Sequence, residues 1–126
     1  MNPAVYDAGA LVAADRNARS MWAEHRVRLE AGVIPCVPAP VIAQVSRSGR
    51  QAQLRRFLRG CDLIAFGEVD AHATGRLLAR SKTSDIVDAA VVVLATDRAA
   101  EIVTADRADI THLLRAAGIS LPIVDA

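Results

Sequence analysis

Three aspartates lie inside or at the ends of apolar segments, and this placement constrains the chain more than any other feature. Asp7 and Asp106 each follow a short apolar run, and Asp88 interrupts the apolar helical segment 85–95. A charged group in apolar surroundings is costly unless it is paired, neutralised or bound to a metal. We therefore expect these carboxylates to meet in one acidic pocket that holds a divalent cation.

Short apolar runs alternate with helical patterns along the whole chain. The expected strands are residues 4–6, 33–37, 62–66, 102–104 and 122–124, and the expected helices are 8–14, 18–30, 41–47, 51–59, 69–80, 85–95 and 108–117. This alternation predicts an α/β three-layer sandwich, with a central parallel sheet flanked by helices. A chain of 126 residues without repeats or linkers is most simply a single domain, residues 1–126. Sites in such folds form at the carboxyl ends of strands, where Asp7 and Asp106 lie.

The basic residues are unevenly distributed. Lys82 is the only lysine among 15 basic residues, and segment 31–61 has no acidic residue. That segment contains Arg47, Arg50, Arg55, Arg56 and Arg59. A basic segment beside an acidic pocket suits a polyanionic substrate whose scissile group meets a metal. The alternative is that the arginines form only a solvated helix face, as most charge runs do.

Neither cysteine usage nor the apolar runs indicate an extracellular or membrane protein. Cys36 and Cys61 lack metal-ligand or redox spacing, so we interpret them as small buried residues in a reducing cytosol. No apolar run approaches the roughly 18 residues of a membrane span. The expected location is therefore cytoplasmic, with no membrane partner.

Three motifs together resemble a known family, the PIN domain. They are residues 5–11 (VYDAGAL), 84–89 (SDIVDA) and 103–110 (VTADRADI), and they occur in the order and spacing of that domain. The likeness extends over nearly the whole chain and is strongest to VapC-type toxins of bacterial toxin–antitoxin systems. It implies a ribonuclease that depends on Mg²⁺ or Mn²⁺ and activates water for attack on RNA.

By position, the resemblance assigns roles to particular residues. Asp7, Asp88 and Asp106 match the metal-binding and catalytic acids, and Thr104 matches a hydroxyl residue that would orient a water. Gln44 takes the place of the usual Glu, so it keeps a carbonyl acceptor but loses a charge that would hold a hard cation.

Two further acids are candidates near the same site. Asp85 is a possible additional ligand because it lies three residues before Asp88. It is equally well explained as a helix N-cap after Ser84. Asp109 is a secondary candidate that a position in a first helical turn would also explain.

The expected partners are RNA, an antitoxin protein and a second copy of the chain in a homodimer. The candidate RNA contacts are Arg47, Arg50, Arg55, Arg56 and Lys82. The family resemblance implies that the antitoxin docks into a hydrophobic groove, for which we expect exposed faces of Trp22, Leu54 and Phe57.

Two other classes of protein compete with a nuclease. A catalytically weak or inactive PIN-like module that binds RNA or protein is supported by Gln44. A phosphoacceptor receiver-like domain also groups aspartates at strand ends, but it needs a lysine after a late strand. Lys82 lies before the apolar helix instead.

Overall fold

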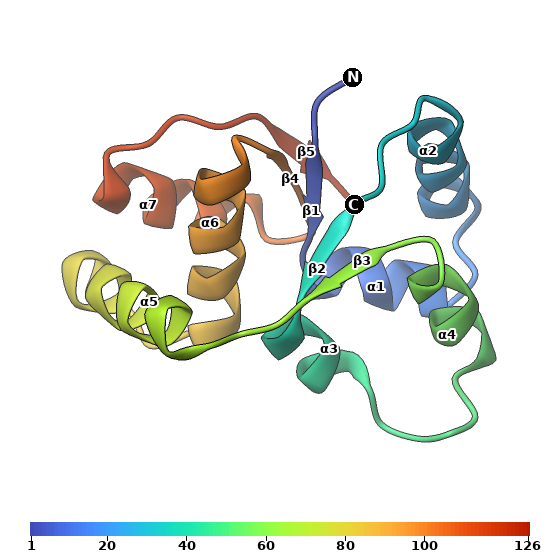
Figure 1. The fold of residues 1–126 in the computed structure, drawn as a ribbon, viewed down its shortest axis with the longest axis horizontal. Helices are drawn as coiled ribbons and strands as arrows, with labels where there is room; N and C mark the ends of the chain where they lie inside the picture. The colour runs from blue at the N-terminus through green and yellow to red at the C-terminus, as the bar shows by residue number, and fades with distance from the viewer.

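The computed structural model describes residues 1–126 and contains a five-stranded sheet in which all neighbouring strands are parallel (Figure 1). The strands are β1 (Ala4–Tyr6), β2 (Cys36–Pro38), β3 (Asp62–Ile64), β4 (Glu101–Thr104) and β5 (Ile123–Asp125). Their order across the sheet is β3-β2-β1-β4-β5. The predicted parallel α/β sandwich is confirmed.

Seven helices cover the two faces of this sheet. They are α1 (Ala8–Asp15), α2 (Arg19–Glu30), α3 (Ala39–Val45), α4 (Ala52–Leu58), α5 (Glu68–Ser81), α6 (Ile86–Arg98) and α7 (Arg107–Ala117). In Figure 1, α1, α2 and α4 lie on one side of the strands, and α5, α6 and α7 lie on the other. Helix α3 contacts both α1 and α6, so it closes the sandwich at one end.

The strand order places a switch of direction at the middle of the sheet. From β1 the chain moves outward to β2 and β3, and it then returns to place β4 and β5 on the opposite side of β1. In open parallel sheets, ligands bind in the crevice at the carboxyl ends of the strands at such a point. The receiver-like alternative has the order 2-1-3-4-5, so this topology excludes it.

The core includes two residues that we expected at the surface. Phe57 is fully buried, and Leu54 is only 2% exposed, because α4 packs against α1 and the Phe57 ring stacks on Tyr6 at 5.5 Å between centroids. The prediction that Leu54 and Phe57 line an exposed groove was therefore wrong. Trp22 is half-buried and remains accessible.

Several element boundaries shift for local reasons. The strand expected from residue 33 begins at Cys36, since the Val33 amide donates to the Arg28 carbonyl and belongs to the turn that ends α2. Helix α3 begins two residues earlier than expected and takes Pro40 into its first turn, where the missing amide hydrogen is not needed. Strand β3 ends at Ile64, opposite the last residue of β2.

Both cysteines are free thiols, with Cys36 buried and Cys61 half-buried. None of the helices combines the length and apolar character needed to span a membrane.

Candidate metal centre

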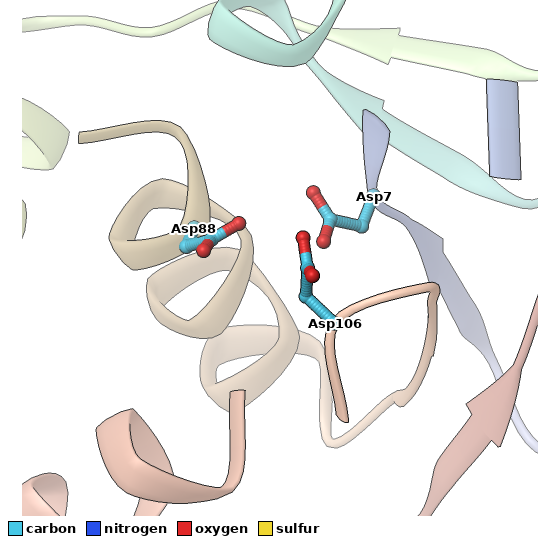
Figure 2. A group of neighbouring side chains, drawn as sticks. All are labelled: Asp7, Asp88 and Asp106. Carbon is cyan, nitrogen blue, oxygen red and sulfur yellow. The ribbon is translucent and has the colours of Figure 1, made fainter. Parts of the chain in front are cut away.

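Asp7, Asp88 and Asp106 meet at the predicted edge of the sheet, and we call them the acidic triad. Each offers one carboxylate oxygen, and these three atoms lie within 4.8 Å of one another. Figure 2 shows the side chains converging from the end of β1, from α6 and from the loop after β4. Asp7 and Asp106 are 99 positions apart in the sequence. The topology of the sheet brings them together with Asp88.

Asp7 is held in place by hydrogen bonds from two sides. Its Oδ1 accepts from the Ala8 amide at 2.7 Å as the N-cap of α1, and its Oδ2 accepts from Thr104 Oγ1 at 2.8 Å. The residue is 2% exposed, and this burial raises the pKa of the carboxyl despite both hydrogen bonds. Asp7 is thus a helix cap and a member of the triad at once.

Thr104 links the two strand-end acids. Its buried hydroxyl donates to the Asp7 carboxylate, and its oxygen accepts from the Asp106 backbone amide at 2.9 Å. Because a hydroxyl has one hydrogen, that hydrogen is used by Asp7. The side chain therefore sets the position of one acid relative to the backbone of the other.

Gly9 allows the first turn of α1 to approach the loop after β4, a contact that sequence reasoning missed. A Cβ atom at Gly9 would lie 2.5 Å from the Ala105 Cβ and 2.9 Å from the Ala105 nitrogen. Such distances require the loop that carries Asp106 to move. A glycine in the first turn of an apolar helix, two residues after a candidate ligand, is the only signal the sequence offers for this contact.

Asp88 carries the least compensated charge of the triad. It is 7% exposed, and its carboxylate accepts no hydrogen bond, whereas its backbone amide donates to Asp85 Oδ1 at 3.0 Å. Burial, followed by the charges of Asp7, Asp85, Asp106 and Asp109, raises its pKa to about 7. None of the ion pairs in the protein neutralises a triad carboxylate.

The donor set fits a hard divalent cation. All three side chains offer oxygen atoms, which Mg²⁺ and Mn²⁺ prefer. Burial and then repulsion from the neighbouring acids raise the pKa of Asp88, and a cation at the same place would relieve that repulsion. The triad therefore suits metal binding better than a purely structural role.

The other two predicted acids lie outside this group of three. Asp85 is exposed and caps α6, as its alternative explanation proposed. Asp109 is exposed in the first turn of α7. Gln44 is exposed on α3, beside the buried Val45.

The basic side chains predicted to contact RNA are all exposed, but they differ in the contacts that they already form within the protein. The Arg47 guanidinium donates to the carbonyls of Ala43 and Ser46 at 3.0 and 2.8 Å, so it completes the end of α3. Arg56 lies over the Trp22 ring at 4.4 Å. None of Arg50, Arg55 and Lys82 forms an ion pair with an acidic residue.

A cavity of about 610 Å³ lies along α2 and beside Arg56 of α4, and none of the triad residues lines it. We call it the α2 groove, and its lining includes Arg19, Trp22, Arg26, Leu29 and Arg56. It combines apolar surface with several cations. Of the groove residues expected from the sequence, it retains only Trp22.

The comparisons show similarity in structure without close similarity in sequence. No family model and no curated protein sequence matches the chain. VapBC2 from Rickettsia felis, bound to a promoter DNA fragment, aligns at a TM-score of 0.71 and 17% identity over 98% of both chains. DNA-bound VapBC from Salmonella typhimurium aligns at 0.66 and 18% identity, over 99% of this chain and 98% of that one. PAE2754 from Pyrobaculum aerophilum aligns at 0.62 and 16% identity, over 98% and 90%. The chain thus has the VapC-like PIN-domain fold.

Proposed function

We propose that this protein is a metal-dependent endoribonuclease and the toxin of a type II toxin–antitoxin pair. The observation that carries the proposal is the acidic triad, whose carboxylate oxygens lie within 4.8 Å at the switch point of a VapC-like sheet. A buried carboxylate with a raised pKa and no hydrogen-bond donor beside it, as at Asp88, is typical of functional sites. The similar VapBC structures support a toxin with an antitoxin partner.

Each residue of the site has a distinct role in this proposal. Asp7, Asp88 and Asp106 would hold Mg²⁺ or Mn²⁺, and Thr104 and Gly9 position two of these acids. When bound, the cation activates water and stabilises negative charge on the phosphodiester. Burial and the neighbouring acids raise the pKa of Asp88 to about 7, so cation binding should strengthen as the pH rises through this value.

RNA would be held outside the triad by basic side chains that form no ion pair within the protein. Arg50 and Arg55 are exposed and lie in a stretch without acidic residues, and Lys82 ends α5. Backbone phosphates bind such groups without regard to sequence. Arg47 contributes less, because two carbonyl groups already accept from its guanidinium.

The antitoxin would dock on the α2 groove. Trp22 and Leu29 offer apolar surface there, and the arginines favour an acidic partner segment. Aromatic residues and arginine are the types that contribute most energy at protein interfaces. This surface replaces the one we expected around Leu54 and Phe57.

Calorimetry with Mn²⁺ tests the metal site directly. The double variant Asp7→Asn with Asp106→Asn should lose measurable Mn²⁺ binding and RNA cleavage, while Asp97→Asn, an exposed change elsewhere on α6, should keep both. Equal Mn²⁺ affinity in the wild type and the double variant would rule out a shared site.

The second candidate is an inactive PIN-like module that binds RNA or protein, and Gln44 is the feature that favours it. Expression of the chain alone should arrest growth if it is a toxin, and the antitoxin should relieve the arrest. Mn²⁺ binding without cleavage of any RNA or growth arrest would favour the inactive module.

A further inference from the structure

A small cleft opens directly beside the acidic triad, between the loop after α5 and helix α7. Its volume is about 280 Å³, and its lining includes Thr83, Ser84, Asp85, Asp88, Asp109 and His112. Asp88 belongs to both the cleft and the triad, so a group bound in the cleft would lie next to the proposed metal. We call this feature the acceptor cleft, because its side chains present hydrogen-bond acceptors.

The hydrogen positions of two lining residues follow from their partners. His112 Nε2 lies 2.8 Å from the Ser81 carbonyl, which can only accept, so Nε2 carries the hydrogen and a neutral ring leaves Nδ1 as an acceptor. Ser81 Oγ donates to the Leu78 carbonyl at 3.2 Å, and in that arrangement the Thr83 hydroxyl, 2.7 Å away, donates to Ser81. The remaining capacity of Thr83 is again that of an acceptor.

The carboxylates in the cleft lining also leave hydrogen-bond acceptors available to a ligand. Asp85 uses Oδ1 to cap α6, which leaves Oδ2 available, and Asp109 forms no ion pair. Asp88 is more than nine-tenths buried and accepts no hydrogen bond at its carboxylate. Ser84 is the one lining side chain with a hydroxyl hydrogen that no protein acceptor takes. The cleft therefore selects a ligand with several adjacent N–H donors.

We propose that the acceptor cleft binds a guanine base of the RNA substrate, next to the phosphodiester that is cleaved. This inference rests on the proposed nuclease function and adds a base preference to it. Proteins read unpaired RNA bases by hydrogen bonds to their Watson–Crick edges. Guanine presents N1–H and the N2 amine side by side, a pair that one carboxylate accepts through both oxygens. Its O6 atom can accept from Ser84.

The other bases match this lining less well. Adenine and cytosine each present one amine beside a ring nitrogen that accepts, and uracil presents one N–H between two carbonyls. Each would place at least one acceptor against a carboxylate or against Thr83. An unpaired acceptor in such a site costs more than a missing contact, because two lone pairs then face each other without a hydrogen.

The test measures binding of uncharged nucleosides by NMR, following the backbone amide of Leu113 at the cleft, with and without saturating Mg²⁺. Guanosine should bind at least about tenfold more tightly than inosine, which lacks only the N2 amine, because a hydrogen bond to a charged group is lost. Adenosine and cytidine should bind as weakly as inosine. Asp109→Asn should remove most of the guanosine preference, while Asp97→Asn, an exposed change elsewhere on α6, should retain it.

The outcomes separate this inference from the nuclease proposal. Equal binding of all four nucleosides to a protein that binds Mg²⁺ and cleaves RNA would overturn the guanine site alone. A preference for guanosine in a protein that binds no divalent cation would support the cleft and overturn the nuclease. If methylguanidinium binds while the nucleosides show no preference, the cleft serves an arginine of a partner protein, and the guanine proposal is wrong.

Discussion

Tyr6 and Asp7 are consecutive residues of one buried segment, but their side chains enter opposite electrostatic environments. The Tyr6 hydroxyl lies 2.9 Å from His25 Nδ1 and 3.4 Å from Arg28, and Arg28 reaches Glu101 at 3.3 Å. We call these four residues the buried polar cluster. Asp7, one residue later, faces Asp88 and Asp106 in the acidic triad.

The two regions differ in whether charge is compensated. In the buried polar cluster, Arg28 is a cation beside the carboxylates of Glu101 and Glu24, and Tyr6 and His25 share a hydrogen bond. In the triad, three carboxylates converge without any cation. Buried polar groups with partners stabilise a unique packing, whereas buried charges without partners cost free energy. The first pattern indicates a structural role and the second a binding site.

Removing the cation that balances the charge in the buried polar cluster should have the largest effect on stability. Arg28→Met removes the cation and leaves Glu101 half-buried without a partner, so the free energy of unfolding should fall by about 3–5 kcal/mol. Urea denaturation measures this change. Arg26→Met, at an exposed site on the same helix, should change it by less than about 0.5 kcal/mol. A similar loss in both variants would mean that the cluster contributes no special stability.

The triad should make the metal-free protein less stable as the pH rises. The pKa of Asp88 is raised from 3.8 to about 7, so between these values the folded state holds a proton that the unfolded state has lost. The free energy of unfolding therefore decreases through this window, by about 4 kcal/mol in total once the pH has passed 7. Asp88→Asn should flatten this dependence, and Mn²⁺ should restore stability to the wild type at pH 8.

His25 in the buried polar cluster should produce the opposite slope. Burial, together with the charge of Arg28, lowers its pKa from 6.5 to about 4. The unfolded state then binds the additional proton, so this residue makes the protein more stable as the pH rises from about 4 to 6.5. The difference between the wild type and Asp88→Asn in the pH dependence of the free energy of unfolding isolates the contribution of Asp88. If the variant shows the same pH dependence as the wild type, the shifted pKa of Asp88 is contradicted.

A smaller effect should come from the close contact that aligns two triad acids. Gly9→Ala should displace the loop of Asp106 and weaken Mn²⁺ binding about tenfold, the scale of changes around metal ligands. Adding Ala105→Gly removes the shortest clash and should recover part of the affinity. Gly75→Ala, where nothing lies within 4 Å, is the matched control. Full affinity in Gly9→Ala would show that the loop adapts without moving Asp106.

The smallest expected change is a gain at Gln44. If this side chain faces the triad, Gln44→Glu adds a charge to a hard-cation site and should tighten Mn²⁺ binding severalfold in calorimetry. Gln53→Glu introduces the same charge on α4 and should leave the affinity unaltered. No difference between the two variants would indicate that Gln44 points elsewhere.

Much of the fold and the three triad acids could be predicted because their signals are local. Apolar runs identify strands and helices over a few residues, and a carboxylate directly after such a run stands out wherever the partner strands lie. The sequence also presented Leu54 and Phe57 as an apolar face for a groove. It did not say whether the protein or a partner covers that face, and here Tyr6 and α1 cover it.

The sequence by itself determined the alternation of strands and helices, the position of Asp7 and Asp106 at strand ends, and the interruption of α6 by Asp88. Only the tertiary structure decided that Thr104 joins two acids, that Gly9 meets Ala105, and that Arg28 pairs with Glu101. These contacts join residues far apart in the chain. They depend on the order of strands in the sheet, and no local pattern of side chains encodes that order.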